Sequence, residues 1–377
     1  MMENKIKEGT IEKIVGVIIV LVVIVAVIVI KNSFNGGNTK YEEIRVATGG
    51  GKEAFLADED FVNILNKKYK ISVVNDSWSN GKLVKTPVVD KKGNKYDAIF
   101  FSDERFYDYY KIDANTSLGE APRDRVLNGS LTLNTPIVIY SWDVVVDALI
   151  AQKIVTLKDG VYYITDMNKL LEYILEGKKW SDIGLNSIYG KINIDSSDPV
   201  TSSPGATYYG LLLSIMTGGD MTSESVAKAL PKLKEFYIKS GYMNNTPADL
   251  FEMYLKTGVG AKPMIVDYEK SVIEFITANK DGWNQVKDKI RILYPTPTIW
   301  NSHCIATFNE KGNKYLDAFN DKDIQQIAWS KYGFRVGVSG GNYDVSSVDV
   351  KGIPQSIDSV TSGLKMDVYN QIIDYLK

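Results

Sequence analysis

Short apolar runs alternate with longer stretches of helical periodicity along most of this chain. Six runs of four to six residues have the length and composition of strands. They are residues 43–47, 71–74, 96–101, 136–140, 191–194 and 263–266. Eight stretches repeat apolar residues at intervals of three and four, as helices do. They are residues 53–67, 142–153, 167–175, 205–216, 223–239, 268–279, 321–332 and 366–377. This alternation predicts an α/β fold with mostly parallel sheets.

One segment near the start departs from this pattern. Residues 14–30 are seventeen consecutive residues without a polar side chain. At about 1.5 Å per residue, they are just long enough to cross the roughly 30 Å hydrocarbon core of a bilayer. No small-residue cleavage pattern follows, which favours an uncleaved anchor over a signal peptide. We expect a cytoplasmic tail at 1–13, a transmembrane helix at 14–30 and a linker at 31–40. The chain is then a single-pass protein of the cell membrane with its bulk outside the cytoplasm.

Small polar residues gather where four of the predicted strands end. The clusters are residues 48–51, residues 102–103, residues 195–205 and residues 267–268. In open α/β sheets, ligands bind outside the carboxyl ends of the strands, where helix N-termini present unpaired N–H groups. Each cluster alone also fits an ordinary helix cap. Their recurrence after four strands favours one shared cleft.

The glycine turn at residues 48–52 is not a phosphate loop. Such a loop places a glycine five positions before its Gly-Lys pair and a Ser or Thr after it. Here Val46 takes the first of these positions and Glu53 follows Lys52. A carboxylate at that point repels phosphate, so the sequence excludes this class of nucleotide site.

Composition narrows the classes of function further. With 377 residues, 44% of them hydrophobic and 24% charged, the chain can form two globular domains. A net charge of -2 without long runs of one sign gives no support to a nucleic-acid-binding surface. The lone cysteine, Cys304, cannot form an internal disulfide, and one Cys with one His cannot furnish a usual zinc site. Residues 58–60 are acidic but lack the spacing of a calcium loop, so we expect them on the solvated face of the first helix and expect no metal site.

Residues 337–341 match G-x-S-x-G, the nucleophile elbow of α/β-hydrolases. That motif needs a histidine later in the chain, whereas the only histidine, His303, precedes Ser339. His303 and Cys304 are adjacent, and neighbours in a strand point to opposite faces. We therefore expect both to be structural, and we expect no enzyme activity, no catalytic residue and no cofactor.

Several phrases, taken in order, carry a resemblance to a known family. They are the glycine turn at 47–51, the run Asn-Thr-Pro-Ile-Val-Ile-Tyr at 134–140, the segment opening with Asp-Pro at 198–212, and residues 263–269, 294–303 and 324–335. In this order they resemble the extracellular solute-binding proteins with the type II periplasmic-binding-protein fold. Residues 134–140 and 294–303 look like the two segments by which that fold crosses between its lobes.

The resemblance implies two α/β lobes with a ligand closed between them. Lobe one would comprise residues 41–134 and 307–377, and lobe two residues 135–306. Carried over position by position, the resemblance suggests six ligand-binding residues. They are Thr48, Gly50, Ser102, Thr201, Ser202 and Tyr268.

Three aspartates in the same loops leave the charge of the ligand open. If Asp103, Asp195 and Asp198 face the cleft, they oppose a simple oxyanion and favour a cation or an amine. If they cap helices and point away, an anion is compatible with the site.

The function expected from this resemblance is capture of a small-molecule ligand outside the cytoplasm for an ABC-type importer. The implied partners are an ABC permease and the membrane, through the N-terminal helix. The alternative is a surface receptor or sensor of the same fold that does not transport. The short cytoplasmic tail expected here would leave no room for a signalling domain, so a sensor would need a partner chain.

Overall fold

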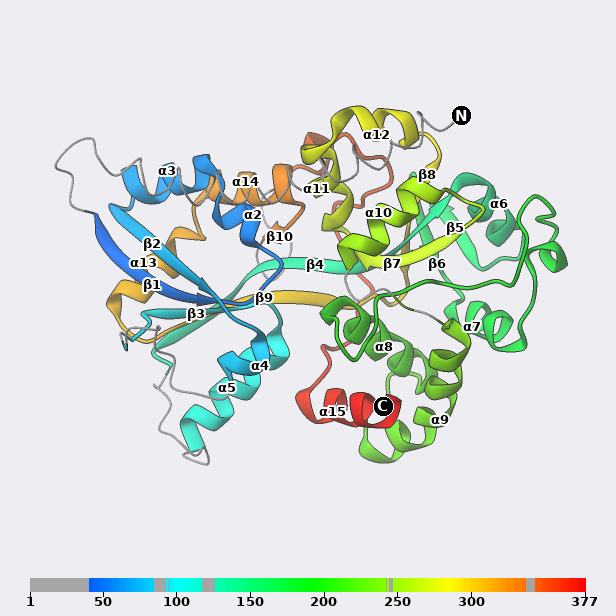
Figure 1. Ribbon diagram of the computed structural model, residues 1–377, viewed down its shortest axis with the longest axis horizontal. Helices are drawn as coiled ribbons and strands as arrows, with labels where there is room; N and C mark the ends of the chain where they lie inside the picture. Colours follow the sequence, from blue (N-terminus) through cyan, green and yellow to red (C-terminus); the bar gives the residue numbers. More distant parts are fainter. Residues whose placement is uncertain are drawn as a thin grey trace, which may run out of the picture.

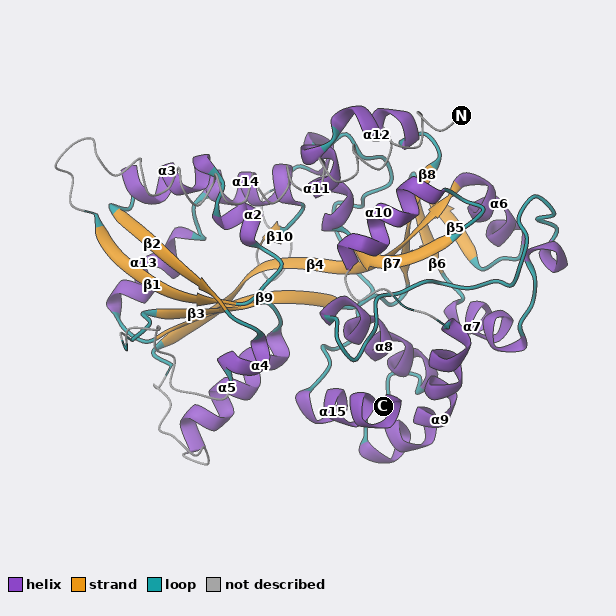
Figure 2. Ribbon diagram, viewed as in Figure 1, coloured by secondary structure: helices purple, strands orange, loops and turns teal. Residues whose placement is uncertain are grey.

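The computed structural model describes residues 41–84, 93, 95–116, 126–241, 243, 247–336 and 343–377. These residues form two lobes that lie side by side in Figure 1. One mixed sheet runs through both lobes in the order β2-β1-β3-β9-β4-β8-β6-β5, with β10 and β7 also paired to β4. Helices cover the sheet on both sides (Figure 2). The predicted α/β class is therefore confirmed.

Strand β4 (Asn128–Trp142) joins the two lobes because it is long enough to belong to both. Its first part pairs with β9 (Trp300–Thr307) and β10 (Arg335–Val336). Its last part pairs with β7 (Met264–Tyr268) and β8 (Ile290–Pro295). Lobe one is completed by β1 (Glu42–Thr48), β2 (Ile71–Ser77) and β3 (Ala98–Phe101), and lobe two by β5 (Val155–Lys158) and β6 (Val161–Ile164).

The expectation of mostly parallel sheets was wrong. Among the described strands, β1 pairs in parallel with β2 and β3, and β6 with β8, but the other six pairs are antiparallel. The reason is the shared strands, since β4 and β9 run in opposite directions next to each other and force antiparallel pairing on their neighbours. The predicted strand at 191–194 is also absent, and only isolated bridges form at Lys191 and Asp195.

The predicted helices form, with changes at their ends. The helices of lobe one are α2 (Glu53–Leu56), α3 (Glu59–Lys67), α4 (Asn80–Leu83), α5 (Glu104–Thr116), α13 (Glu310–Ala318) and α14 (Lys322–Tyr332). The remaining helices are α6 (Asp143–Ala151), α7 (Met167–Glu176), η1 (Trp180–Ile183), α8 (Ser203–Met216), α9 (Ser223–Ser240), α10 (Pro247–Thr257), α11 (Lys270–Ala278), α12 (Lys280–Val286), η2 (Val345–Ser347) and α15 (Met366–Leu376). Helix α8 is apolar on nearly all sides and is buried along most of its length, as that composition requires.

The predicted helix at 53–67 is divided at Asp58, and the acidic run there is not simply solvated. The Asp58 carboxylate caps α3 by accepting hydrogen bonds from the N–H groups of Asp60 and Phe61. It also accepts from Lys331 Nζ and Tyr332 Oη, each at 2.9 Å, which ties α3 to α14. An aspartate at this position stabilises a helix start, and the lysine compensates its burial.

The lobes differ from the expected boundaries at two places. Residues 300–306 were expected in lobe two, but β9 pairs with β3 and belongs to the sheet of lobe one. The C-terminal residues were expected in lobe one, whereas α15 packs against α8 and α9 of lobe two and also contacts α5 of lobe one. The larger apolar core extends through both lobes, so they are packed together in this conformation.

The predicted tail, transmembrane helix and linker at residues 1–40 lie outside the described residues. Within the part of the chain that is described, none of the helices combines the length and the apolar character that crossing a bilayer requires.

Candidate interlobe binding site

The glycine turn after β1 is packed tightly against the end of β3. A Cβ atom at Gly49 would lie 2.6 Å from Asn80 Oδ1 and 3.1 Å from Ser102 N, so a larger residue there would displace the Asn80 side chain and crowd the Ser102 backbone. Below the turn, Lys52 is buried and donates a hydrogen bond of 2.6 Å from Nζ to the carbonyl of Gly49. Its ammonium lies 4.5 Å from the centre of the Phe100 ring. Gly50, one of the predicted ligand residues, is exposed at the tip of this turn.

Two other predicted residues of lobe one are held by asparagines. Thr48 is buried at the end of β1 and donates a hydrogen bond of 3.1 Å from Oγ1 to Asn75 Oδ1. Ser102 follows β3, and its Oγ accepts a hydrogen bond of 2.7 Å from Asn80 Nδ2. The Ser102 carbonyl accepts another of 3.1 Å from Asn301 Nδ2 on β9. Ser102 is thus fixed beside the glycine turn, and the two clusters predicted at these strand ends do meet.

The third loop, residues 195–205, belongs to lobe two. Ser202 is the N-cap residue of α8, but its Oγ is hydrogen-bonded to Ser197 Oγ at 2.7 Å rather than to the helix. Thr201 is exposed in the preceding turn, and its N–H donates to the Asp198 carbonyl. Neither side chain has a described hydrogen bond to the Gly49, Ser102 or Tyr268 regions.

The chemistry that links the lobes is centred on Asp103 and Arg105, both buried at the start of α5. The Asp103 Oδ1 atom accepts hydrogen bonds from Arg105 Nε at 2.8 Å and from Arg105 N at 2.9 Å. Arg105 Nη2 donates to the other carboxylate oxygen. Burial acts to lower the pKa of Arg105, but the charge and hydrogen bonds of Asp103 outweigh it and raise the pKa above its ordinary value. The pair is ionic and locally neutral.

Lobe two contacts this pair directly. Ser203, the first residue of α8, donates a hydrogen bond of 3.2 Å from Oγ to Asp103 Oδ2. Tyr268, at the end of β7, lies near the same carboxylate. The pKa of Tyr268 is raised well above its ordinary value, mainly by burial and secondly by the negative charge of Asp103. The side chains of Thr207 and Ser203 act in the opposite direction and lower this pKa. Tyr268 is therefore a neutral hydroxyl at physiological pH.

Two hydrogen-bond donors in this interlobe cluster are left unused. Arg105 Nη1 and Tyr268 Oη are buried and have no hydrogen-bond partner among the described residues. The carbonyl oxygen of the Asn301 side chain is buried and unpartnered in the same way. An unmade hydrogen bond at a buried polar group costs about 1 to 3 kcal/mol, and a ligand between the lobes that accepts from these two donors would recover that cost. We define this interlobe cluster as Asp103, Arg105, Ser203 and Tyr268.

The three loop aspartates have different roles. Asp103 faces lobe two, but Arg105 neutralises it, so it neither requires a cationic ligand nor opposes an anion with a full charge. Asp195 forms an ion pair of 3.1 Å with Lys262. Asp198 Oδ1 accepts from Val200 N at 2.9 Å and so stabilises the turn before α8. The latter two therefore act within lobe two.

Comparison with known proteins shows which solved structures share this fold. No protein-family model matches the chain, and no curated protein does. Solved structures do match, at low identity. A protein of Bordetella parapertussis assigned as an extracellular solute-binding protein superposes with a TM-score of 0.56 and 12% identity, covering 89% of this chain and 96% of that one. The chain has the fold of an extracellular solute-binding protein.

Two further structures have the same fold. IdiA (FutA) of Trichodesmium, in complex with iron and citrate, has a TM-score of 0.55 and 12% identity over 89% of this chain and 97% of that one. The periplasmic binding protein AfuA of Actinobacillus pleuropneumoniae, with fructose-6-phosphate bound, has a TM-score of 0.50 and 11% identity over 88% and 97%. The resemblance found in the sequence is thus confirmed at the level of the fold.

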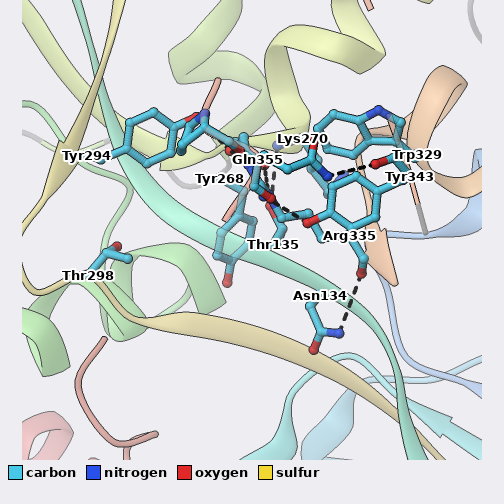
Figure 3. Close-up of polar contacts among 12 residues, drawn as sticks. Asn134, Thr135, Tyr268, Lys270, Tyr294, Thr298, Trp329, Arg335, Tyr343 and Gln355 are labelled. Atoms are coloured by element: carbon cyan, nitrogen blue, oxygen red, sulfur yellow. Dashed lines mark hydrogen bonds and ion pairs between the residues drawn. The ribbon is translucent and has the colours of Figure 1, made fainter. Parts of the chain in front are cut away.

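A second buried charge cluster in this solute-binding fold is complete without a ligand (Figure 3). Arg335 of β10 donates from Nε to Glu269 Oε2 at 2.6 Å and from Nη2 to Glu269 Oε1 at 2.9 Å. Its other N–H groups reach Tyr343 Oη and the carbonyls of Pro354 and Gln355, so all five donors of the guanidinium are used. Figure 3 shows the hydroxyl of Tyr268 pointing away from this cluster. We assign Arg335 and Glu269 to fold stability at the crossing between the lobes.

The residues considered for catalysis have structural surroundings. His303 and Cys304 point to opposite faces of β9, since the His303 ring packs near Phe334 whereas Cys304 belongs to a separate apolar cluster. Burial lowers the pKa of His303 well below its ordinary value and raises that of Cys304 well above it, so both are uncharged. The G-x-S-x-G match at residues 337–341 lies outside the described residues. Across the described chain, no three His, Cys, Asp or Glu side chains are grouped as a metal site.

Sequence reasoning missed Arg105 and Ser203, although a signal existed for the first. The chain has only six arginines among 44 basic residues, so each arginine stands out against the lysine background. Arg105 is also two residues after a strand-end aspartate, and a bidentate pair prefers arginine to lysine. Nothing local marks Ser203, because its partner Asp103 is one hundred positions away.

Proposed function

We propose that this chain is an extracytoplasmic solute-binding protein that captures a small ligand between its two lobes and delivers it to an ABC-type importer. The observation that carries the proposal is the interlobe cluster. Residues from both lobes meet there, and two buried donors, Arg105 Nη1 and Tyr268 Oη, have no partner among the described residues. A ligand that joins the lobes stabilises the closed state by its greater affinity for that state.

The donors indicate part of the ligand's chemistry. A ligand at the cluster supplies hydrogen-bond acceptors to Arg105 Nη1 and Tyr268 Oη, such as carboxylate, phosphoryl, carbonyl or hydroxyl oxygens. Asn301 Oδ1, on β9 beside Ser102, is available to accept from a ligand donor. Because Asp103 cancels the charge of Arg105, the cluster favours a ligand with acceptor and donor groups over a small, multiply charged oxyanion.

The carried-over residues have unequal support in this proposal. Tyr268 is part of the cluster, Gly50 lies on the neighbouring glycine turn, and Ser102 lies beside that turn at the end of β3. Thr48, Thr201 and Ser202 are assigned to the site by resemblance alone. We also propose that residues 14–30 anchor the chain in the cell membrane, on the strength of their apolar run.

The test is a ligand screen by thermal unfolding of the full-length chain, followed by intrinsic tryptophan fluorescence. The panel comprises citrate with and without ferric iron, sugar phosphates, neutral sugars, amino acids and inorganic oxyanions. A ligand at about one hundred times its Kd adds roughly 2.7 kcal/mol to the free energy of unfolding, which raises Tm by several degrees. We expect a saturable shift that is lost in Arg105→Gln. A folded protein that responds to nothing in the panel would contradict the proposal.

Neighbouring genes provide a second test of the importer role. An adjacent permease and ATPase that co-purify with the loaded protein are the expected result. Ligand binding without any transport partner would instead support the receptor of the same fold.

A further inference from the structure

The C-terminal segment is docked on lobe two before it reaches its last helix. Thr298, between β8 and β9, donates from its N–H to the Ser359 carbonyl at 3.0 Å and accepts from the Thr361 N–H at 2.8 Å. Thr361 Oγ1 and Ser214 Oγ of α8 lie 2.7 Å apart. Leu364 is buried against α8 at Gly210, where an added Cβ would lie 3.0 Å from its side chain. The segment therefore follows α8 along lobe two.

Helix α15 continues this contact with an amphipathic face. Val368, Ile372 and Leu376 are buried and recur every four residues, so they lie on one side of the helix. The helix packs on α8 and α9. Lys234 of α9 donates to the Leu376 carbonyl at 2.6 Å, where the negative end of the helix dipole favours a cation.

Tyr369 of α15 reaches the other lobe. The Tyr369 ring lies 4.7 Å from the guanidinium carbon of Arg105 and 6.2 Å from the Phe106 ring in an edge-on arrangement. Both partners are at the start of α5 in lobe one. In Figure 1, α15 lies beneath α8 on the side facing α5. A helix anchored on lobe two is thus in contact with the arginine of the interlobe cluster.

We propose that α15 is a latch that holds the lobes closed, with Tyr369 as the residue that positions Arg105. The inference rests on the proposed function and extends it. Asp103 binds one edge of the guanidinium through Nε and Nη2, and the Tyr369 ring covers a face of the group, so Nη1 is left for the ligand. When the lobes separate, Arg105 loses the ring and Asp103 loses Ser203 in the same motion. The site is therefore complete only while α15 contacts α5.

The experiment measures the distance between the lobes in the full-length chain without ligand. Spin labels are attached at Lys67→Cys in lobe one and Ser187→Cys in lobe two, both exposed, while the buried Cys304 is left unlabelled. Pulsed electron-paramagnetic-resonance distances are compared for the wild type, Tyr369→Leu, Tyr369→Phe and Tyr375→Leu. The last is a matched control, because Tyr375 is an exposed tyrosine on the same helix.

We expect the closed, short-distance population to dominate in the wild type. Tyr369→Leu should reduce the ratio of closed to open molecules by about two- to thirty-fold, the range expected for a cation–π contact. Tyr369→Phe, which retains the ring, and Tyr375→Leu should resemble the wild type. Equal distances for the Leu variant and the wild type, or a wild type that is open throughout, would overturn the latch.

The result is separable from that of the ligand screen. If Tyr369→Leu changes the distance between the lobes in a protein that binds no ligand, the role of α15 is supported and ligand capture is contradicted. If the protein binds a ligand but the distance between the lobes is the same in Tyr369→Leu and the wild type, ligand capture is supported and the latch is contradicted.

Discussion

Ser203 in lobe two donates a hydrogen bond of 3.2 Å to Oδ2 of Asp103 in lobe one, and the same carboxylate accepts hydrogen bonds from the Arg105 guanidinium. Asp103 thereby connects the two lobes and orients Arg105, whose Nη1 donor has no partner among the described residues. This arrangement explains the role of Asp103, for which the sequence alone left the direction of the carboxylate open. The negative charge of Asp103 is balanced by Arg105, so the proposed site would present mainly hydrogen-bond donors to a ligand.

Replacing Tyr268 with Phe should separate stability from binding. The variant removes a buried hydroxyl that has no partner among the described residues, so the free energy of unfolding without ligand should be unchanged or rise by about 1 kcal/mol. Affinity for a ligand found in the screen should fall about five- to tenfold, because one donor is lost. Chemical denaturation and calorimetric titration measure the two quantities.

The control for this prediction is Tyr315→Phe. Tyr315 is likewise buried with an unpartnered hydroxyl, but it lies in α13 of lobe one and its ring packs on Phe319. It should match Tyr268→Phe in stability and leave affinity unaltered. An unchanged affinity in Tyr268→Phe would remove Tyr268 from the site.

Removing one member of the Glu269–Arg335 pair should be strongly destabilising. Arg335→Leu leaves Glu269 buried without its counter-charge, at a cost of about 3 to 5 kcal/mol. Glu269→Leu likewise leaves Arg335 buried without a counter-charge. The double variant should lose much less free energy of unfolding than the sum of the losses in the two single variants. Urea denaturation of the four proteins checks this. Additive losses would show that the two charges act independently, against the structure.

Lys52 should make stability depend on pH above neutrality. Burial lowers its pKa from the ordinary value of 10.5 to about 7, so between pH 7 and pH 10.5 the unfolded chain binds more protons than the folded one. Stability from this residue therefore rises with pH across that window and is constant below it. The gain should be roughly 2 kcal/mol between pH 7 and pH 9.

The Lys52→Met variant isolates this effect. The difference in the free energy of unfolding between variant and wild type should be largest near pH 7 and shrink toward pH 9. Lys331→Met is the control, since Lys331 has a raised pKa beside Asp58 and should give a constant difference over the same range. A constant difference for Lys52→Met would mean that the lysine is solvated in the folded protein.

The sequence by itself determined the class of fold and most of its helices. Periodicity is a local property, so the stretches that became α8, α9 and α14 were recognisable from the apolar residues within each stretch. The ends of β1 and β3 were also recognisable, because small polar residues follow these strands, whereas the cluster expected at residues 267–268 lies within β7. These signals lie within a few residues of one another and need no knowledge of packing.

Tertiary structure alone decided how those pieces pair and which polar groups meet. The 15-residue β4 serves both lobes, which turned an expected parallel sheet into a mixed one. Asp103 and Ser203 are one hundred positions apart, and Arg105 and Tyr369 are 264 positions apart. Such contacts arise from burial of the shared core and from the need to compensate buried charge, and no local pattern records either.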